Sequence, residues 1–103
     1  MSDEEEVTVE DCNPYGVVPG RYYEGVTVTV RKLKDGRYRC KITAKSGSTR
    51  ERGYVEPTNE EETVLRGSEL DIKQEVKQML SEEYLPYFYR AFNKAIDQLE
   101  EED

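Results

Sequence analysis

The sequence lacks several residue types on which enzyme and metal chemistry depend. Histidine and tryptophan are absent, and the 103 residues include only two cysteines and two phenylalanines. Without histidine the chain has neither the commonest general base nor the commonest metal ligand. No HExxH, P-loop, GxGxxG or CxxC motif occurs in it. We therefore expect a non-enzymatic protein with no catalytic residues, no cofactor and no metal site.

Positive charge and long apolar runs are also scarce. The chain holds 15 basic and 23 acidic residues, a formal net charge of −8, which disfavours general attraction to nucleic acid or anionic membranes. No apolar run approaches the roughly 20 residues that span a bilayer. Four of the first six residues are acidic and none is basic, unlike the basic start of a signal peptide. We expect a cytoplasmic protein that does not bind membranes, in which Cys12 and Cys40 are free thiols rather than a disulfide.

The length of the chain favours one domain. We expect an acidic, disordered leader over residues 1–6, a single domain over 7–99 and a frayed acidic tail over 100–103. Alternating Val7 to Val9 predicts a short edge strand. The prolines and glycines of residues 11–25 predict an irregular loop, which would include Cys12.

Residues 26–45 give the clearest strand signal, because apolar residues alternate on both sides of Asp35-Gly36. A two-residue turn there would place the two apolar rows on opposite faces. A three-residue loop, with Gly36 in the left-handed region, instead pairs Val30 with Cys40 and Val28 with Ile42. We therefore predict a bulged hairpin over 26–45. A third strand over 49–55 is expected to follow a turn at residues 46–48.

Two helices are predicted in the C-terminal third. Ser68 and Asp71 fit a capping box at the start of the first, and Pro86 fixes the start of the second near residues 82–85 because proline is tolerated only in a first turn. Apolar residues recur at helical spacing in both. The fold class is therefore α+β, a three- to four-stranded antiparallel sheet covered on one face by two C-terminal helices.

The charges are unevenly distributed along the chain. Residues 1–25 carry seven acids and one base, residues 26–55 two acids and nine bases, and residues 56–103 fourteen acids and five bases. The segment charges are thus −6, +7 and −9. The acidic runs, Glu60 to Glu62 among them, are expected in loops and at helix ends as solvated surface. The bases either neutralise these acidic flanks within the fold or form a basic face of the sheet.

The chain is also rich in tyrosine, with eight, and tyrosines are common anchors of interfaces. The leading hypothesis is an interaction protein that binds and inhibits or regulates a macromolecular partner, such as a basic nucleic-acid-binding protein or complex. In outline, the hairpin and two helices resemble some small acidic phage-encoded inhibitors of host defence, such as anti-CRISPR or anti-restriction proteins. The residues expected to contact the partner are Glu69, Glu75, Glu82, Glu83, Tyr84, Tyr87 and Tyr89.

The alternative hypothesis is a nucleic-acid-binding module that uses the basic outer face of the sheet. A purely structural subunit or a self-associating protein is a third possibility. The residues that would contact phosphate in a nucleic-acid-binding module are Arg31, Arg37, Arg39, Lys41, Arg50 and Arg52.

Overall fold

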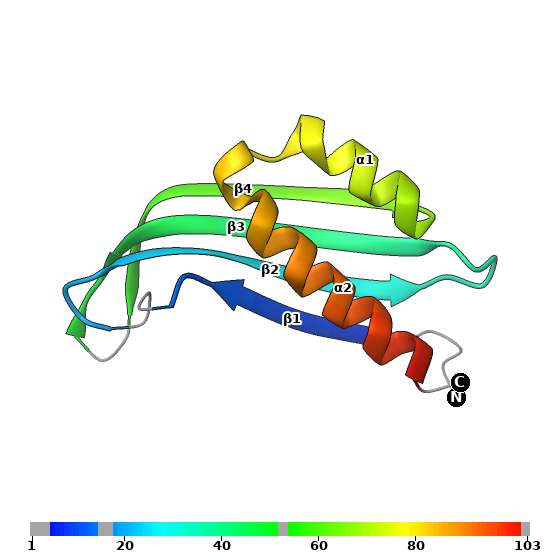
Figure 1. Cartoon of the computed structure of the whole chain (residues 1–103), viewed down its shortest axis with the longest axis horizontal. Helices are drawn as coiled ribbons and strands as arrows, with labels where there is room; N and C mark the ends of the chain where they lie inside the picture. The colour runs from blue at the N-terminus through cyan, green and yellow to red at the C-terminus, as the bar shows by residue number, and fades with distance from the viewer. Residues whose placement is uncertain (1–4, 15–17, 52–53, 102–103) are drawn as a thin grey trace.

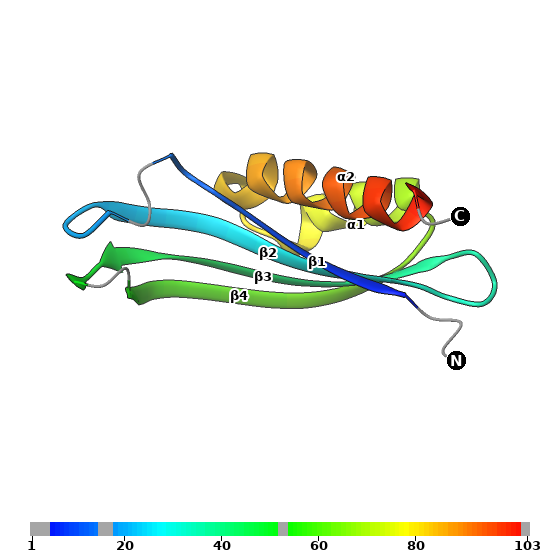
Figure 2. The ribbon, with the colours of Figure 1, turned by 90° about the horizontal axis from the view of Figure 1, so that it is seen from below.

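The computed structural model has a single sheet with all of its helices on one side (Figures 1 and 2). It describes residues 5–14, 18–51 and 54–101. The four strands are antiparallel and lie in the order in which they follow one another in the chain. This arrangement confirms the predicted α+β class. The elements are β1 (Glu6–Cys12), β2 (Tyr22–Lys32), β3 (Tyr38–Thr49), β4 (Val55–Gly67), α1 (Glu69–Met79), the short 3₁₀ helix η2 (Glu82–Tyr84) and α2 (Leu85–Glu101).

The hairpin formed by β2 and β3 has the predicted register. Val30 lies opposite Cys40 and Val28 opposite Ile42, so both apolar rows share one face. The N–H of Gly36 donates to the Leu33 carbonyl at 3.0 Å, and the N–H of Leu33 donates to the Arg37 carbonyl at 2.8 Å. Gly36 has a φ of 86°, a conformation that glycine adopts without steric cost. The bulged hairpin is therefore confirmed.

The predicted strand over 49–55 is wrong. Strand β3 continues through residues 46–48 to Thr49, the chain reverses between Thr49 and Val55, and the next strand is β4. A bulge interrupts the pairing of β3 with β4, because Ser46 lies opposite Asn59 whereas Gly47 lies opposite Pro57. The expected turn at residues 46–48 is thus an irregularity within a long strand. Glu60 to Glu62 accordingly lie in an edge strand and not in a loop.

The N-terminal strand is longer than the sequence indicated. The predicted edge strand over 7–9 is present as part of β1, which begins at Glu6 and pairs with β2. The expected loop position of Cys12 is wrong, because this residue ends β1 opposite Gly25. Of the predicted leader over 1–6, residues 1–4 lie outside the described residues. Backbone pairing with β2 therefore reaches into the acidic segment.

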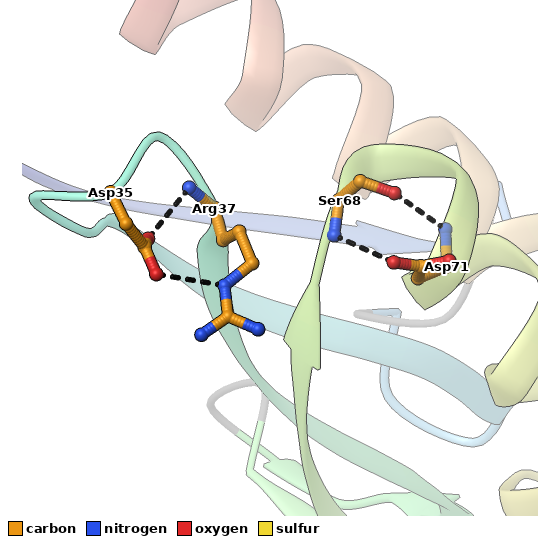
Figure 3. A network of polar contacts seen from close by, with 4 residues as sticks. All are labelled: Asp35, Arg37, Ser68 and Asp71. Atoms are coloured by element: carbon orange, nitrogen blue, oxygen red, sulfur yellow. Dashed lines mark hydrogen bonds and ion pairs between the residues drawn. The ribbon is translucent and has the colours of Figure 1, made fainter.

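Both helices begin where the sequence predicts. The Asp71 N–H donates to the Ser68 hydroxyl at 3.1 Å and the Ser68 N–H donates to the Asp71 carboxylate at 3.2 Å, which completes the capping box (Figure 3). Helix α2 follows η2 and starts at Leu85, so Pro86 occupies its first turn. Helix α2 continues to Glu101, and the rest of the predicted tail, residues 102–103, lies outside the described residues.

The core lies between the helical layer and one face of the sheet. Helix α2 packs on β1 and β2, whereas α1 packs on β4 (Figure 1). Burial of these apolar side chains is the main source of stability, at roughly 25 cal/mol per Å². The opposite face of the sheet is left uncovered by any helix (Figure 2); we call it the open face. The largest fully buried side chains include Tyr84, Phe88, Phe92, Ile42 and Ile72.

Candidate interaction surfaces

The open face carries both signs of charge, which differs from the basic face that the sequence allowed. Strand β4 contributes Glu60 and Glu62 to it, and β1 contributes Glu6 and Glu10, because side chains alternate along each strand. Several of its bases are paired: Arg31 contacts Glu6 at 2.9 Å and Lys41 lies 3.8 Å from Glu62. Part of the positive charge of this face is thus neutralised within the fold. The bases of this face are Arg31, Arg39, Lys41, Lys45 and Arg66.

The six bases proposed to contact phosphate do not form one surface. Arg31, Arg39 and Lys41 share the open face. Arg37 lies at the hairpin turn, where its guanidinium contacts Asp35 at 2.8 Å (Figure 3). Arg50 follows β3 at the opposite end of the sheet and contacts Glu56. Arg52 lies outside the described residues.

The unpredicted strand β4 brings two acidic runs together. The carboxylate of Glu61 accepts hydrogen bonds from the backbone N–H of Ser81, at 3.0 Å, and from the Ser81 hydroxyl. Ser81 directly precedes η2, so the acids of η2 lie beside those of β4. We call Glu60, Glu61, Glu62, Glu82 and Glu83 the acidic edge. Sequence reasoning missed it because it placed Glu60 to Glu62 in a loop.

The two halves of the acidic edge differ in their neighbours. On the side of the open face, Lys45 lies opposite Glu60 in the register and Lys41 lies near Glu62. In η2, by contrast, Glu82 and Glu83 are exposed and form no ion pair within the part of the chain that the structure describes. The η2 side therefore offers two unneutralised carboxylates to solvent.

A buried polar network holds η2 against the sheet. Tyr84 is fully buried, so its predicted place on the surface is wrong. Its hydroxyl lies 2.9 Å from the Ser46 hydroxyl and accepts a hydrogen bond from the Asn59 amide at 2.9 Å. Polar groups that leave water need such partners. Together with the contacts of Glu61 and Ser81, this network holds in place the backbone that carries Glu82 and Glu83.

The other tyrosines proposed as anchors make contacts within the domain. Tyr87 is half-buried, and the Cζ atom of Arg90 lies over its ring, 5.3 Å from the centroid. Burial, and then the hydrogen bond and charge of Glu24, raise the pKa of Tyr87. The Tyr89 hydroxyl donates to the Lys73 carbonyl of α1 at 3.2 Å. The most exposed tyrosines of the described residues are instead Tyr22 and Tyr54, 53% and 64% exposed.

The two proposed acids of α1 lie in different surroundings. Glu69 contacts Lys73 one helical turn later at 3.1 Å, so its charge is partly neutralised. Glu75 is exposed and has no ion pair within the described ranges. Helix α1 packs on β4, the strand that carries three of the five residues of the acidic edge. With Glu82 and Glu83, Glu75 is thus one of the exposed acids of the helical layer that have no ion pair in the described residues.

We expect the stability of the protein to depend on pH through Glu61. The hydrogen bond from the Ser81 hydroxyl, and then those from the Ser81 N–H and the Asn59 amide, hold the pKa of Glu61 below its ordinary value of 4.5. A lowered folded-state pKa contributes stability above the unfolded pKa, and this stability is lost as the pH falls through the folded value. The free energies of unfolding of the wild type and of Glu61→Gln, measured with urea, should therefore differ most near neutral pH and become similar in acid. If the free energy of unfolding depended on pH in the same way in both proteins, Glu61 would not be the source of the pH dependence.

The two thiols are free and poorly suited to nucleophilic chemistry. Burial alone raises the pKa of Cys40 to about 12. Burial, and then the charges of Glu10 and Asp11, raise the pKa of Cys12. A reactive thiolate requires the opposite shift.

The described residues contain no group of three or more acidic or cysteine side chains arranged to hold a metal ion. None of the helices in the described ranges combines the length and apolar character needed to cross a membrane. No protein-family model, curated protein or solved structure matches the chain.

Proposed function

We propose that the protein is a non-enzymatic interaction protein that binds a basic surface of a macromolecular partner through the acidic edge. The observation that carries this proposal is the pair of hydrogen bonds between Ser81 and Glu61. These bonds join the acids of β4 to those of η2 along one edge of the molecule, where Glu60 and Glu62 lie on the open face and Glu82 and Glu83 belong to the helical layer. Inhibition of a nucleic-acid-binding protein, as by a phage-encoded inhibitor of host defence, is the form of this function that the acidity favours.

The rigidity of the acidic edge supports this proposal. Binding that orders mobile side chains or loops loses affinity to conformational entropy. Here η2 is held by the buried Tyr84 network, and β4 is held by its pairing with β3. Carboxylates gathered on such a backbone attract a basic partner over several ångströms and accelerate its association at low salt. The proposal therefore predicts fast, salt-sensitive binding to a positively charged protein.

Reversing the charges of η2 tests this function. We expect Glu82→Lys/Glu83→Lys to weaken capture of the partner from native extract by about tenfold or more, as loss of interfacial charge pairs does. The matched control is Asp97→Lys/Glu100→Lys, which makes the same charge change at exposed positions of α2. The control should capture the partner as the wild type does. Quantitative affinity capture at two salt concentrations, with and without nuclease, measures both.

Two results would contradict the proposal. Equal loss of capture in both double variants would mean that only the net charge matters. Loss of wild-type capture after nuclease treatment would mean that nucleic acid, and not protein, is the partner. Circular dichroism and thermal unfolding of each variant verify that the substitutions leave the domain folded.

A further inference from the structure

Three arginines lie side by side in one row across the open face. The strand register places Arg31 opposite Arg39 and Arg39 opposite Arg66. Because neighbouring strands are about 4.8 Å apart, the three α-carbons span about 10 Å. Lys41 lies two residues beyond Arg39 on the same face of β3. Sequence reasoning named three of these residues but missed Arg66, because it did not foresee β4.

The charge of this row is only partly neutralised. Arg31 contacts Glu6 at 2.9 Å, and Lys41 is 3.8 Å from Glu62. Arg39 and Arg66 have no ion pair or hydrogen bond to another side chain in the parts of the chain that are described. Like charges directly opposite each other destabilise a sheet. The free protein therefore holds an arrangement of charges that a bound anion would stabilise.

The chemistry of the row favours phosphate groups. The planar guanidinium presents parallel N–H donors that match phosphate oxygens in a bidentate manner. The row contains no aromatic side chain on which a base would stack, since its four members are Glu6, Arg31, Arg39 and Arg66. The exposed Tyr22 lies nine residues along β2 from Arg31, roughly 30 Å away at 3.3 Å per residue. The row can therefore recognise phosphate but offers no aromatic ring on which a base could stack.

We propose that Arg31, Arg39 and Arg66 bind a compact run of two or three phosphate groups, with Lys41 as a fourth cation. The extent of the site is limited because the carboxylates of Glu10, Glu60 and Glu62 lie farther along the same face. A long polyanion lying along the strands would meet these carboxylates. An oligophosphate, or the phosphates at one point of a nucleic-acid strand, covers the row without reaching them. Among the described residues, the three arginines form no ion pair with the acidic edge, and of the four cations only Lys41 lies against it, at Glu62, so loss of the arginines and loss of Glu82 and Glu83 can be tested independently.

Two probes distinguish the possible sources of the phosphates. Inorganic tripolyphosphate and a fluorescent single-stranded oligonucleotide are titrated separately into the full chain at about 50 mM salt, and then at about 200 mM. Binding is followed by amide and arginine Nε chemical shifts and by fluorescence anisotropy. We expect shifts at the three arginines with at least one probe, and tripolyphosphate should compete with any oligonucleotide that binds. The probe with the higher affinity identifies the source.

A pair of double variants tests whether the row is the site. We expect Arg39→Gln/Arg66→Gln to weaken binding by about tenfold or more, as loss of charge-assisted hydrogen bonds does. The control Lys77→Gln/Lys94→Gln removes the same charge from exposed positions on α1 and α2 and should stay within about twofold of the wild type. Equal losses in both double variants, or no binding of either probe at low salt, would overturn the proposal. Arg66→Gln alone provides the same test if the double variant fails to fold.

Discussion

Replacing Tyr84 with alanine is expected to lower the free energy of unfolding by about 4 kcal/mol, a large part of the 5–15 kcal/mol typical of a domain. The side chain is fully buried in the core, so its removal leaves a cavity. Its hydroxyl also contacts the hydroxyl of Ser46, which is itself buried. Urea unfolding followed by circular dichroism measures the loss.

Tyr84→Phe separates packing from hydrogen bonding in the same experiment. It keeps the ring but removes the partner of Ser46 and Asn59, and we expect a loss of about 1–3 kcal/mol, as for other buried groups left unsatisfied. A loss in Tyr84→Phe as large as in Tyr84→Ala would show that the network, and not the ring, carries the stability. Wild-type stability in Tyr84→Ala would contradict the buried position of this residue.

The hairpin and the helices could be predicted because their signals are local. Side chains alternate between the two faces of a strand, so only one pairing of the two strands buries Val28, Val30 and Cys40 together. That pairing requires a residue in the left-handed conformation at the turn, which Gly36 provides. Ser68 and Asp71 are three residues apart, and their mutual hydrogen bonds depend on little else. Such features are decided within a few residues, so the sequence alone identifies them.

Strand β4 could not be predicted because its pairing is decided by distant residues. Its sequence contains Pro57, Asn59 and three successive glutamates, which are all poor formers of isolated strands. In the sheet, however, β4 is an edge strand, and charged residues are favourable there because they oppose aggregation. Lys41 and Lys45 of β3 lie beside or opposite its glutamates. Cross-strand pairing thus outweighed local propensity.

The candidate surfaces were predicted only in part, for the same reason. Glu82 and Glu83 were identified from their place before a helix, which is a local feature. Their association with Glu61 depends on β4, as does the place of Arg66 in the arginine row. The sequence predicts a surface position for Tyr84 because nothing local indicates that Ser46 and Asn59 satisfy its hydroxyl inside the core.

Gly47→Ala is expected to lower the free energy of unfolding by about 3 kcal/mol, at the upper end of the cost of overpacking. A Cβ at this position would collide with the backbone carbonyl of Glu56 and crowd the Cα of Pro57. Backbone atoms cannot rotate away as a side chain can, so β4 must move away from β3 here. Hydrogen exchange should show loss of protection near residues 55–58 and retained protection near Leu65.

Gly36→Ala is the matched control, because the two glycines are required for different reasons. Gly36 has a φ of 86°, and no atom lies within 4 Å of the place a Cβ would take, so its substitution costs only the left-handed conformation, about 1 kcal/mol. Equal losses at the two positions would contradict the close approach at Gly47.

The close approach at Gly47 also permits the bulge that sets the register of β4. Because of the bulge after Ser46, Val55 and not Glu56 lies opposite the buried Thr49. A continuous register would set a carboxylate against that buried position, so Gly47 is the residue that lets an acidic strand pair along the full length of β3.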